Sequence, residues 1–339
     1  MPQPLRIGIL GAGYMAKVHG TNLNKIDGVE IAAICSFDPA LSSTLAQDIG
    51  APNAALFEDF TRMLDESKLD AVCIAVPPFV HKGEVVAAAQ RGLHILIEKP
   101  IALKLETARA MADAVQKAGV ISQVGYQFRF KNSIKRLHAA IADGTAGKPT
   151  LFTGRFWVNM DGSPWWRDAS QSGGQIFEQL IHFYNLAVAS LGTPVSVTGL
   201  MANLCHADQD DYRIEDTSVG TIRFANGALA SITGSNCAVP GRFFSDFRIV
   251  CEKITVDYQT TGQPWVKPDL ATWYEGDQAE EIDESGDPHN AVDEDFIAAI
   301  REGRPARCPI AEGARDAHLV QTIVQSAQQN ETPLEFNPA

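Results

Sequence analysis

The first residues that could do chemistry form a glycine-rich turn at positions 11–16, directly after a short apolar segment. Two glycines in GxGxxA spacing allow a tight turn and let the backbone approach a pyrophosphate, whose charge is favoured at the N-terminus of the following helix. A strand pattern before, a helical pattern after and a second strand at 29–35 complete the context that this motif needs. We therefore expect a dinucleotide cofactor to contact Gly11, Gly13, Tyr14, Met15 and Ala16.

The tip of the second strand should meet the adenosine ribose of that cofactor. An acidic residue is usual about 20 positions after the glycine turn, because a carboxylate binds the ribose hydroxyls and repels a 2′-phosphate. Here the tip reads Ser36, Phe37 and Asp38, with no arginine after it to bind a phosphate. Asp38 precedes Pro39 and could equally well cap a helix. The three residues are predicted cofactor contacts, and the choice between NAD and NADP stays open.

Two further groups follow later strands. Pro77, Pro78 and His81 come after one apolar strand, and Glu98 and Lys99 come after the next. In an open parallel sheet, ligands bind outside the carboxyl ends of the strands, so all five are predicted to line the cofactor site. For Lys99, directly followed by a proline, the alternative is a solvated cation paired with Glu98.

An apolar helix predicted over 174–191 carries the remaining chemistry. Glu178 is its only charged residue, so the helix should be buried nearly all round. Polar residues at i, i+3, i+7 and i+10 draw one stripe along it: Gln175, Glu178, His182 and Asn185. Buried ionisable groups are costly unless they are paired or face a cavity. The stripe therefore indicates the wall of a site, the alternative being a histidine that only bonds a backbone carbonyl.

The elements that position these groups fall into two domains. Apolar strands at 5–10, 31–35, 71–76, 94–97 and 120–124 alternate with helical patterns, which predicts a doubly wound parallel α/β sheet over residues 1–124. Residues 125–339 are predicted to form an α+β domain with a large, open, mostly antiparallel sheet, in which Asn226-Gly227 marks a hairpin. The closing helices, at about 291–328, are expected to pack back on the first domain.

Composition excludes several classes of protein. The 339 residues carry 41 acidic and 28 basic side chains, a net charge of −13 without a basic cluster, so a nucleic-acid partner is not expected. Acid gathers at 208–216 and 275–287, which we expect to be solvated loops. No run approaches the roughly 18 apolar residues of a membrane span. The six cysteines form no CxxC pair, which indicates reduced thiols, no metal motif and a cytoplasmic protein.

These motifs occur together in a known family. The GxGxxA turn, Pro77-Pro78 with His81, the Glu98-Lys99-Pro100 run and the segment from Gly173-Gly174 to His182 have the order and spacing of the Gfo/Idh/MocA oxidoreductases, which the chain resembles over almost its whole length. The resemblance implies hydride transfer between C4 of NAD or NADP and a carbinol carbon of a sugar, inositol or other polyol. It also implies a homodimer or homotetramer formed through the outer face of the second sheet.

The resemblance further implies roles for residues. His182 would take the proton of the substrate hydroxyl, and Lys99, often followed by a cis peptide bond, would hydrogen-bond the same oxygen. The family usually has an aspartate where Glu178 stands, so whether Glu178 contacts substrate or only orients His182 stays open. Arginine, tryptophan and amide side chains should bind the polyol, although core packing and structural ion pairs are the alternatives. These predicted substrate contacts are Gln127, Arg129, Trp166, Arg167 and Asn185.

Two other functions remain as alternatives. A glycosidase that oxidises its substrate transiently with a bound NAD would cleave glycosides without accumulating reduced cofactor. A dinucleotide-sensing regulator could share the fold, but it would have no need of Lys99, Glu178 and His182 together.

Overall fold

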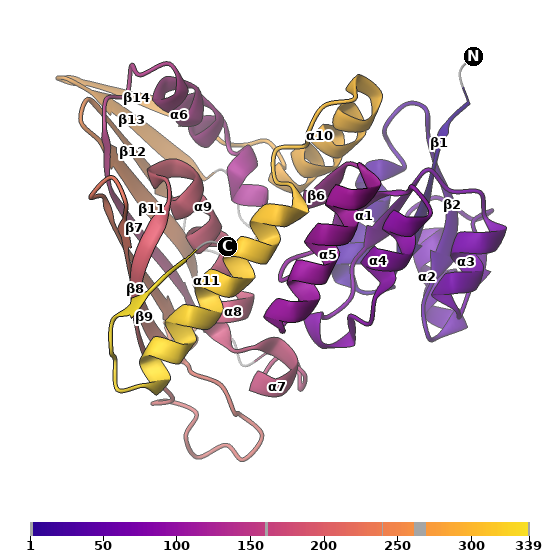
Figure 1. The fold of residues 1–339 in the computed structure, drawn as a ribbon, viewed down its shortest axis with the longest axis horizontal. Coiled ribbons are helices and arrows are strands. Elements are labelled where there is room, and N and C mark those ends of the chain that lie inside the picture. The colour runs from indigo at the N-terminus through magenta and orange to yellow at the C-terminus, as the bar shows by residue number, and fades with distance from the viewer. Residues whose placement is uncertain (1–2, 160–161, 239, 261–268, 338–339) are drawn as a thin grey trace. The chain divides into compact units, whose positions relative to one another are not determined.

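The computed structural model describes residues 3–159, 162–238, 240–260 and 269–337. The chain divides into two compact units (Figure 1). The first unit comprises Met1–Gln127 and Asp287–Ala314, and the second comprises Phe128–Gly286 and Arg315–Ala339.

The first unit contains the predicted doubly wound sheet. Within the described residues it has six parallel strands in the order β3-β2-β1-β4-β5-β6. The central strands are buried on both faces, with Ile7, Val72 and Ile95 fully inaccessible to solvent, which explains their unbroken apolar sequences. The strands are β1 (Leu5–Leu10), β2 (Val29–Cys35), β3 (Ala55–Phe57), β4 (Ala71–Ile74), β5 (His94–Ile97) and β6 (Ser122–Val124).

Helices connect these strands, and side-chain caps fix where several of them begin. Asp38, Asp59 and Asp287 each accept a backbone N–H at the start of a helix, which satisfies amides that have no partner within it. The last helix of the unit, α10, packs against α1 although the two lie far apart in sequence. The helices are α1 (Tyr14–Leu23), α2 (Pro39–Asp48), α3 (Phe60–Glu66), η1 (Pro78–Val80), α4 (Glu84–Gln90), α5 (Leu105–Ala118) and α10 (Pro288–Glu302).

The second unit is built on a large, mostly antiparallel sheet. Its described residues form nine strands in the order β14-β13-β12-β11-β7-β10-β9-β8-β15, of which only β7 and β10 pair in parallel. The predicted hairpin at Asn226-Gly227 is confirmed: it joins β9 and β10, and Gly227 has φ +87°. The strands are β7 (Pro149–Val158), β8 (Pro194–Ala202), β9 (Thr217–Phe224), β10 (Leu229–Ser235), β11 (Phe243–Cys251), β12 (Ile254–Gln259), β13 (Leu270–Glu275), β14 (Gln278–Asp283) and β15 (Leu334–Glu335).

Helices line one face of this sheet, as Figure 1 shows for α6, α9 and α11. The prediction of a single helix over 174–191 is wrong in one respect, because the structure divides this segment into α8 (Gln175–Glu178) and α9 (Ile181–Leu191). The N–H of Leu180 donates to the carbonyl of Gln175, five residues back, at 3.1 Å, so the turn is wider than an α-helical one. The other helices are η2 (Gln127–Phe130), α6 (Asn132–Ala142), α7 (Ala169–Ser172) and α11 (Ile310–Gln328). Across the described ranges, no helix combines the length and apolarity needed to span a membrane.

The acidic stretch at 208–216 is a loop whose first half is exposed, as predicted, whereas the stretch at 275–287 is only partly a loop. Residues 278–283 form the edge strand β14, whose side chains are exposed or half-buried, so the strand is solvated but regular. At the end of the other stretch, Asp216 is fully buried and accepts the backbone N–H groups of Leu204, Cys205 and His206. Its charge therefore anchors a loop instead of facing solvent.

Candidate functional site

The glycine turn of the first unit is packed on one side and open on the other. Gly11 has φ +109°, and a Cβ there would lie 2.2 Å from the carbonyl oxygen of Ala75. At Gly13, by contrast, a Cβ would meet no atom of the chain within 4 Å. Tyr14 is 68% exposed, whereas Ala16 is fully buried and packs in the core. The backbone before α1 can therefore receive a phosphate group, as the motif predicts.

At the tip of β2, local hydrogen bonds occupy two of the predicted ribose contacts. The Ser36 hydroxyl accepts the N–H of Asp38 and donates to its carbonyl, at 3.1 and 2.9 Å. Asp38 accepts the N–H of Ala40 through Oδ1 at 2.8 Å, which confirms that it caps α2. Phe37 is 89% exposed. If Asp38 also binds a ribose, it must do so while its carboxylate caps α2.

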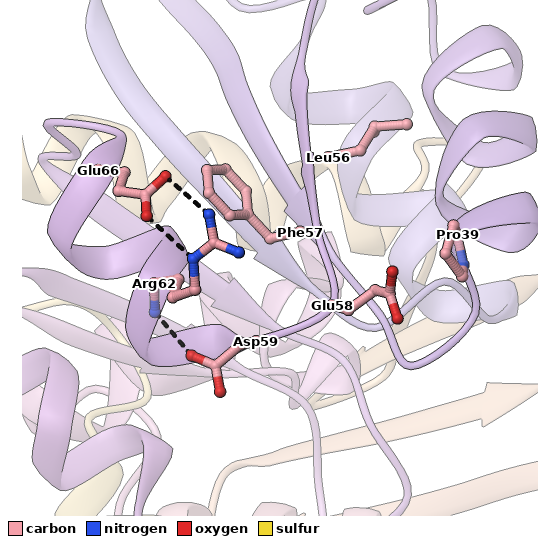
Figure 2. Close-up of a pocket in the computed structure, with 7 residues that line it drawn as sticks. All are labelled: Pro39, Leu56, Phe57, Glu58, Asp59, Arg62 and Glu66. Atoms are coloured by element: carbon pink, nitrogen blue, oxygen red, sulfur yellow. Dashed lines mark hydrogen bonds and ion pairs between the residues drawn. The ribbon is translucent and has the colours of Figure 1, made fainter.

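A hollow lies beside this tip, at the end of the neighbouring strand β3. Figure 2 shows the guanidinium of Arg62 directed at Glu66, with which it forms an ion pair at 3.0 Å. With one arginine and three carboxylates, the hollow carries a net negative formal charge. It is lined by Pro39, Leu56, Phe57, Glu58, Asp59, Arg62 and Glu66.

His81 is directed at the start of α4. Its Nδ1 hydrogen-bonds Glu84, whose second carboxylate oxygen accepts the N–H of Lys82 at 2.8 Å. Burial works to raise the pKa of Glu84, but the bond to His81 and its charge lower it below its ordinary value. Pro77 and Pro78 enter the short helix η1 at the end of β4. The histidine thus has a structural partner, and its contact with a cofactor stays a prediction.

Glu98 and Lys99 follow β5, as predicted, and the Lys99-Pro100 peptide bond is cis, as the resemblance implied. Glu98 is buried, and its Oε2 accepts the backbone N–H of Lys99 at 3.1 Å. Its Oε1 contacts Nε2 of His19 at 2.9 Å. Glu98 therefore acts on Lys99 through the backbone, and the Lys99 side chain is half-buried.

In the second unit, Glu178 ends α8 and is held by a tryptophan. Trp166 donates its indole N–H to Glu178 Oε2 at 3.0 Å. Trp166 is 4% exposed and packs with Tyr212 and Ile214, so it belongs to an apolar cluster as well. This hydrogen bond orients the carboxylate that sequence analysis singled out.

His182 lies in the first turn of α9 and is 7% exposed. Its ring meets the ring of Phe128 nearly edge-on, with centroids 5.7 Å apart. Two other members of the predicted stripe have structural partners. Gln175 hydrogen-bonds Ser218 and Asn236 on the sheet. The division of the helix places Gln175 and Glu178 on α8 and His182 and Asn185 on α9.

Asn185 joins a buried polar network. Its amide donates to Asp316 at 2.7 Å, and its oxygen accepts from Arg129 at 3.4 Å. Arg129 is 8% exposed, while Arg167 bonds the exposed Asp211 at 2.8 Å. These contacts favour a structural ion pair for Arg167 and a place in a buried hydrogen-bond network for Arg129. Gln127 is half-buried in η2 and is the last residue of the first segment of its unit.

Glu215 is a functional candidate that sequence analysis missed. Its Oε1 accepts the N–H of Ile176 at 2.7 Å, at the start of α8. Burial raises the pKa of Glu215 to about 7, although backbone hydrogen bonds act in the opposite direction. Gly174 makes room for it, because a Cβ there would lie 2.4 Å from Glu215 Oε2. The only sequence signal was a carboxylate pair directly before a strand.

One group of metal-ligand types converges among the residues that the structure describes. Donor atoms of Cys205, Asp216 and Cys237 lie within 4.8 Å of one another. The carboxylate of Asp216 already accepts several backbone N–H groups of its own loop. The cluster is therefore explained as a loop anchor with two thiols beside it.

Comparison with known proteins agrees with this architecture. Residues 5–126 match the model of an oxidoreductase family with an NAD-binding Rossmann fold, and residues 134–257 match the Gfo/Idh/MocA C-terminal domain. A chain with these two domains is a dinucleotide-binding oxidoreductase. This chain belongs to the Gfo/Idh/MocA family.

Individual relatives are moderately similar. The uncharacterized oxidoreductase YrbE of Bacillus subtilis is 31% identical over 247 residues, covering 71% of this chain and 70% of the relative. The scyllo-inositol 2-dehydrogenase (NAD(+)) of the same organism is 29% identical over 245 residues, with the same coverages. Levoglucosan dehydrogenase in complex with NADH has a TM-score of 0.85 at 21% identity, over 99% of this chain and 100% of that one. This last likeness shows the fold alone.

Proposed function

We propose that this oxidoreductase interconverts a secondary alcohol and a ketone on a sugar, inositol or related polyol. The proposal rests on two features of one chain. A glycine turn before α1 can receive a phosphate group, and three side chains can donate or accept a proton: Lys99, Glu178 and His182. Relatives named as inositol and glucoside dehydrogenases support the substrate class. When bound, the nicotinamide supplies or accepts the hydride. The chain must then bind the cofactor, orient the alcohol and move one proton.

The cofactor fits the glycine turn. Gly11 cannot carry a side chain, and Gly13 leaves open space before the first N–H groups of α1. These amides would hold the pyrophosphate. For the ribose, the carboxylates around the hollow of Figure 2 and at Asp38 favour NAD over NADP, because a 2′-phosphate would be repelled.

His182 is proposed as the general base in the oxidation direction. An imidazole titrates near working pH and can take the proton of a hydroxyl. Lys99 is proposed to hydrogen-bond the reacting oxygen and to stabilise its developing negative charge. Glu178, held by the Trp166 indole, would orient His182 or bind a neighbouring hydroxyl.

Replacing His182 tests this assignment. We expect His182→Ala to lower kcat by about 10²–10⁴, the usual contribution of a general acid or base, with NAD affinity unchanged. His138→Ala is a matched control, because His138 is a half-buried histidine of the same unit that bonds Ser190. Steady-state kinetics and NADH fluorescence titration measure the two quantities. Normal turnover of His182→Ala would refute the role.

A substrate panel separates the alternatives. Inositols, aldoses and glycosides should be assayed with NAD and NADP separately, following both nicotinamide absorbance and product chromatography. Accumulating NADH identifies a dehydrogenase, whereas glycoside cleavage without NADH identifies the glycosidase. Cofactor binding without any turnover would favour the dinucleotide-sensing regulator.

A homodimer or homotetramer is proposed on the open face of the second sheet. On that face Leu151 and Leu229 lie opposite each other in neighbouring strands and are 37% and 45% exposed. A symmetric partner would cover such a surface. Light scattering at assay concentration tests this, since a monomer would contradict it.

A cytoplasmic location and the lack of a nucleic-acid partner are also proposed. All six cysteines are free thiols in the structure, which suits a reducing compartment. The net charge of −13 opposes binding to a phosphate backbone. Cell fractionation and a DNA-binding assay at low salt test these two points.

A further inference from the structure

A buried histidine of the first unit touches two carboxylates that come from distant parts of the chain. His19, on α1, is 1% exposed. Its Nδ1 lies 2.6 Å from Oδ1 of Asp293 on α10, and its Nε2 lies 2.9 Å from Oε1 of Glu98 at the end of β5. Asn22, one turn further along α1, donates to the other oxygen of Asp293 at 2.9 Å. The imidazole therefore bridges three elements of the unit.

The geometry defines the charge of this ring. An ionised carboxylate can only accept hydrogen bonds, so a ring with a carboxylate at each nitrogen must donate from both and is an imidazolium. Burial alone would lower the pKa of His19, but hydrogen bonds and charges from Asp293 and Glu98 raise it to about 10. Burial raises the pKa of Asp293 above its ordinary value, although His19 and Asn22 act in the opposite direction. The two oxygens of Asp293 lie against Nδ1 of His19 and the amide N–H of Asn22, so both of them have a donor.

Glu98 transmits the contact to Lys99. While Oε1 faces His19, Oε2 accepts the backbone N–H of Lys99 at 3.1 Å. Burial works to raise the pKa of Glu98, but His19 and the charge of Lys99 lower it. Gly125 leaves space for this carboxylate, since a Cβ there would lie 2.4 Å from Oε1. Glu98 thus stays ionised and fixed in a buried place.

We infer that His19 is a positioning residue for Lys99: its buried positive charge holds Glu98 ionised, and Glu98 in turn fixes the backbone from which the Lys99 ammonium extends. Asp293 is the second positioning residue, because it keeps the proton on His19. The inference rests on the proposed role of Lys99 in turnover. It gives this buried cluster of His19, Asp293 and Glu98 a role that neither the glycine turn nor the substrate groups perform.

Other ionisable groups interact with the cluster of His19, Asp293 and Glu98 and affect how its charge depends on pH. His289 on α10 acts on both carboxylates, and Lys99 acts on Glu98. Cys73 on β4 also senses Asp293 and Glu98, which with burial raise the pKa of its thiol well above the ordinary value. The thiol is therefore neutral at working pH and adds no charge.

Two substitutions test the inference in the intact protein. His19→Gln cannot carry the charge, so we expect kcat to fall by about tenfold or more, because small displacements at a reacting group are costly. Asp293→Asn keeps the shape but removes a charge, so His19 should lose its proton at lower pH. The alkaline limit of kcat should then move to lower pH by about one unit or more. A purely structural defect would lower kcat equally at all pH values.

Controls and outcomes separate the possible failures. His94→Gln removes another histidine of the same unit, whose Nδ1 only accepts the N–H of Ile121, and should leave the pH profile unchanged. Histidine-selective ¹⁵N NMR of the intact protein at pH 8 reports the charge of His19 without any turnover. A neutral ring, or a His19→Gln enzyme with unchanged kcat, would overturn the inference. If no polyol is oxidised while the NMR shows an imidazolium, the proposed function fails and the charged bridge stands.

Discussion

Two glutamates in different units, Glu98 buried and Glu215 partly buried, hold the backbone beside proposed catalytic residues, and they do so in different ways. Glu98 accepts the N–H of Lys99 and also faces the His19 ring, whereas Glu215 accepts the N–H of Ile176 at the start of α8. The partner cation lowers the pKa of Glu98, while burial raises that of Glu215 to about 7. A buried carboxylate therefore keeps its charge across the working range only where a cation accompanies it.

Among the substitutions that test this comparison, we expect the largest loss of stability at the two glycines that make room for the carboxylates, Gly174 and Gly125. In Gly174→Ala, the new Cβ would lie 2.4 Å from Glu215 Oε2 on a backbone with φ +93°, so strain adds to the clash. We expect a loss of about 3 kcal/mol of unfolding free energy. Gly125→Ala would meet Glu98 at 2.4 Å without a positive φ, and about 1–2 kcal/mol is expected.

Urea unfolding followed by circular dichroism measures both variants. If Gly125→Ala proved the more destabilising of the two, the emphasis on strain at Gly174 would be wrong. Gly227→Ala is a control for φ alone, because a Cβ there meets no atom within 4 Å.

The next largest effect concerns pH. A carboxyl group whose folded pKa is raised binds more protons in the folded state, so stability falls as pH rises from about 4.5 to about 7. Glu215 is partly solvent-accessible, so we expect this loss to be about 1–2 kcal/mol and Glu215→Gln to remove it. Glu98 has the opposite sign, since its contribution is present above its ordinary pKa and is lost as pH falls below about 4.

Unfolding free energies of the wild type and Glu215→Gln between pH 4.5 and 8 test the slope. Glu66→Gln is a suitable control, because Glu66 is an exposed carboxylate of a surface ion pair. An identical slope in the wild type and Glu215→Gln would show that Glu215 does not titrate in this range.

The smallest effect belongs to a third carboxylate, Glu178, which is half-buried and bonded by a side chain instead of the backbone. Glu178→Gln keeps an acceptor for the Trp166 indole, so stability should change by less than about 1 kcal/mol. Urea unfolding of the variant beside the wild type measures this change. A large loss of stability would mean that Glu178, like Glu98, carries a structural charge.

The first unit is easier to predict from the sequence than the second, for a physical reason. Strands covered on both faces read as unbroken apolar runs, and the glycine turn and the Glu98-Lys99-Pro100 run are local in sequence. The short strand β3 and helix α3 were missed, since neither is long enough to show a period. The acidic edge strand β14 has the composition of a loop because its residues are exposed or half-buried on both faces.

In the second unit, contacts between distant segments override the local pattern. The break after Glu178 depends on the wide turn from Gln175 to Leu180, which no single residue type signals. Asn185 was expected to face substrate, but it bonds Asp316, 131 residues further along the chain. Likewise, nothing near His19 in the sequence announces Asp293 as its partner.

The return of the chain to its first unit has a consequence for biosynthesis. Asp293 lies 274 residues after His19, beyond strands β7 to β14 of the second sheet. When only the N-terminal half of the chain has left the ribosome, His19 and Glu98 are therefore present, but Asp293 has not yet been synthesised. A fragment truncated after Gln127 should therefore be unstable. We expect the first unit to reach its stable fold only after α10 has been synthesised.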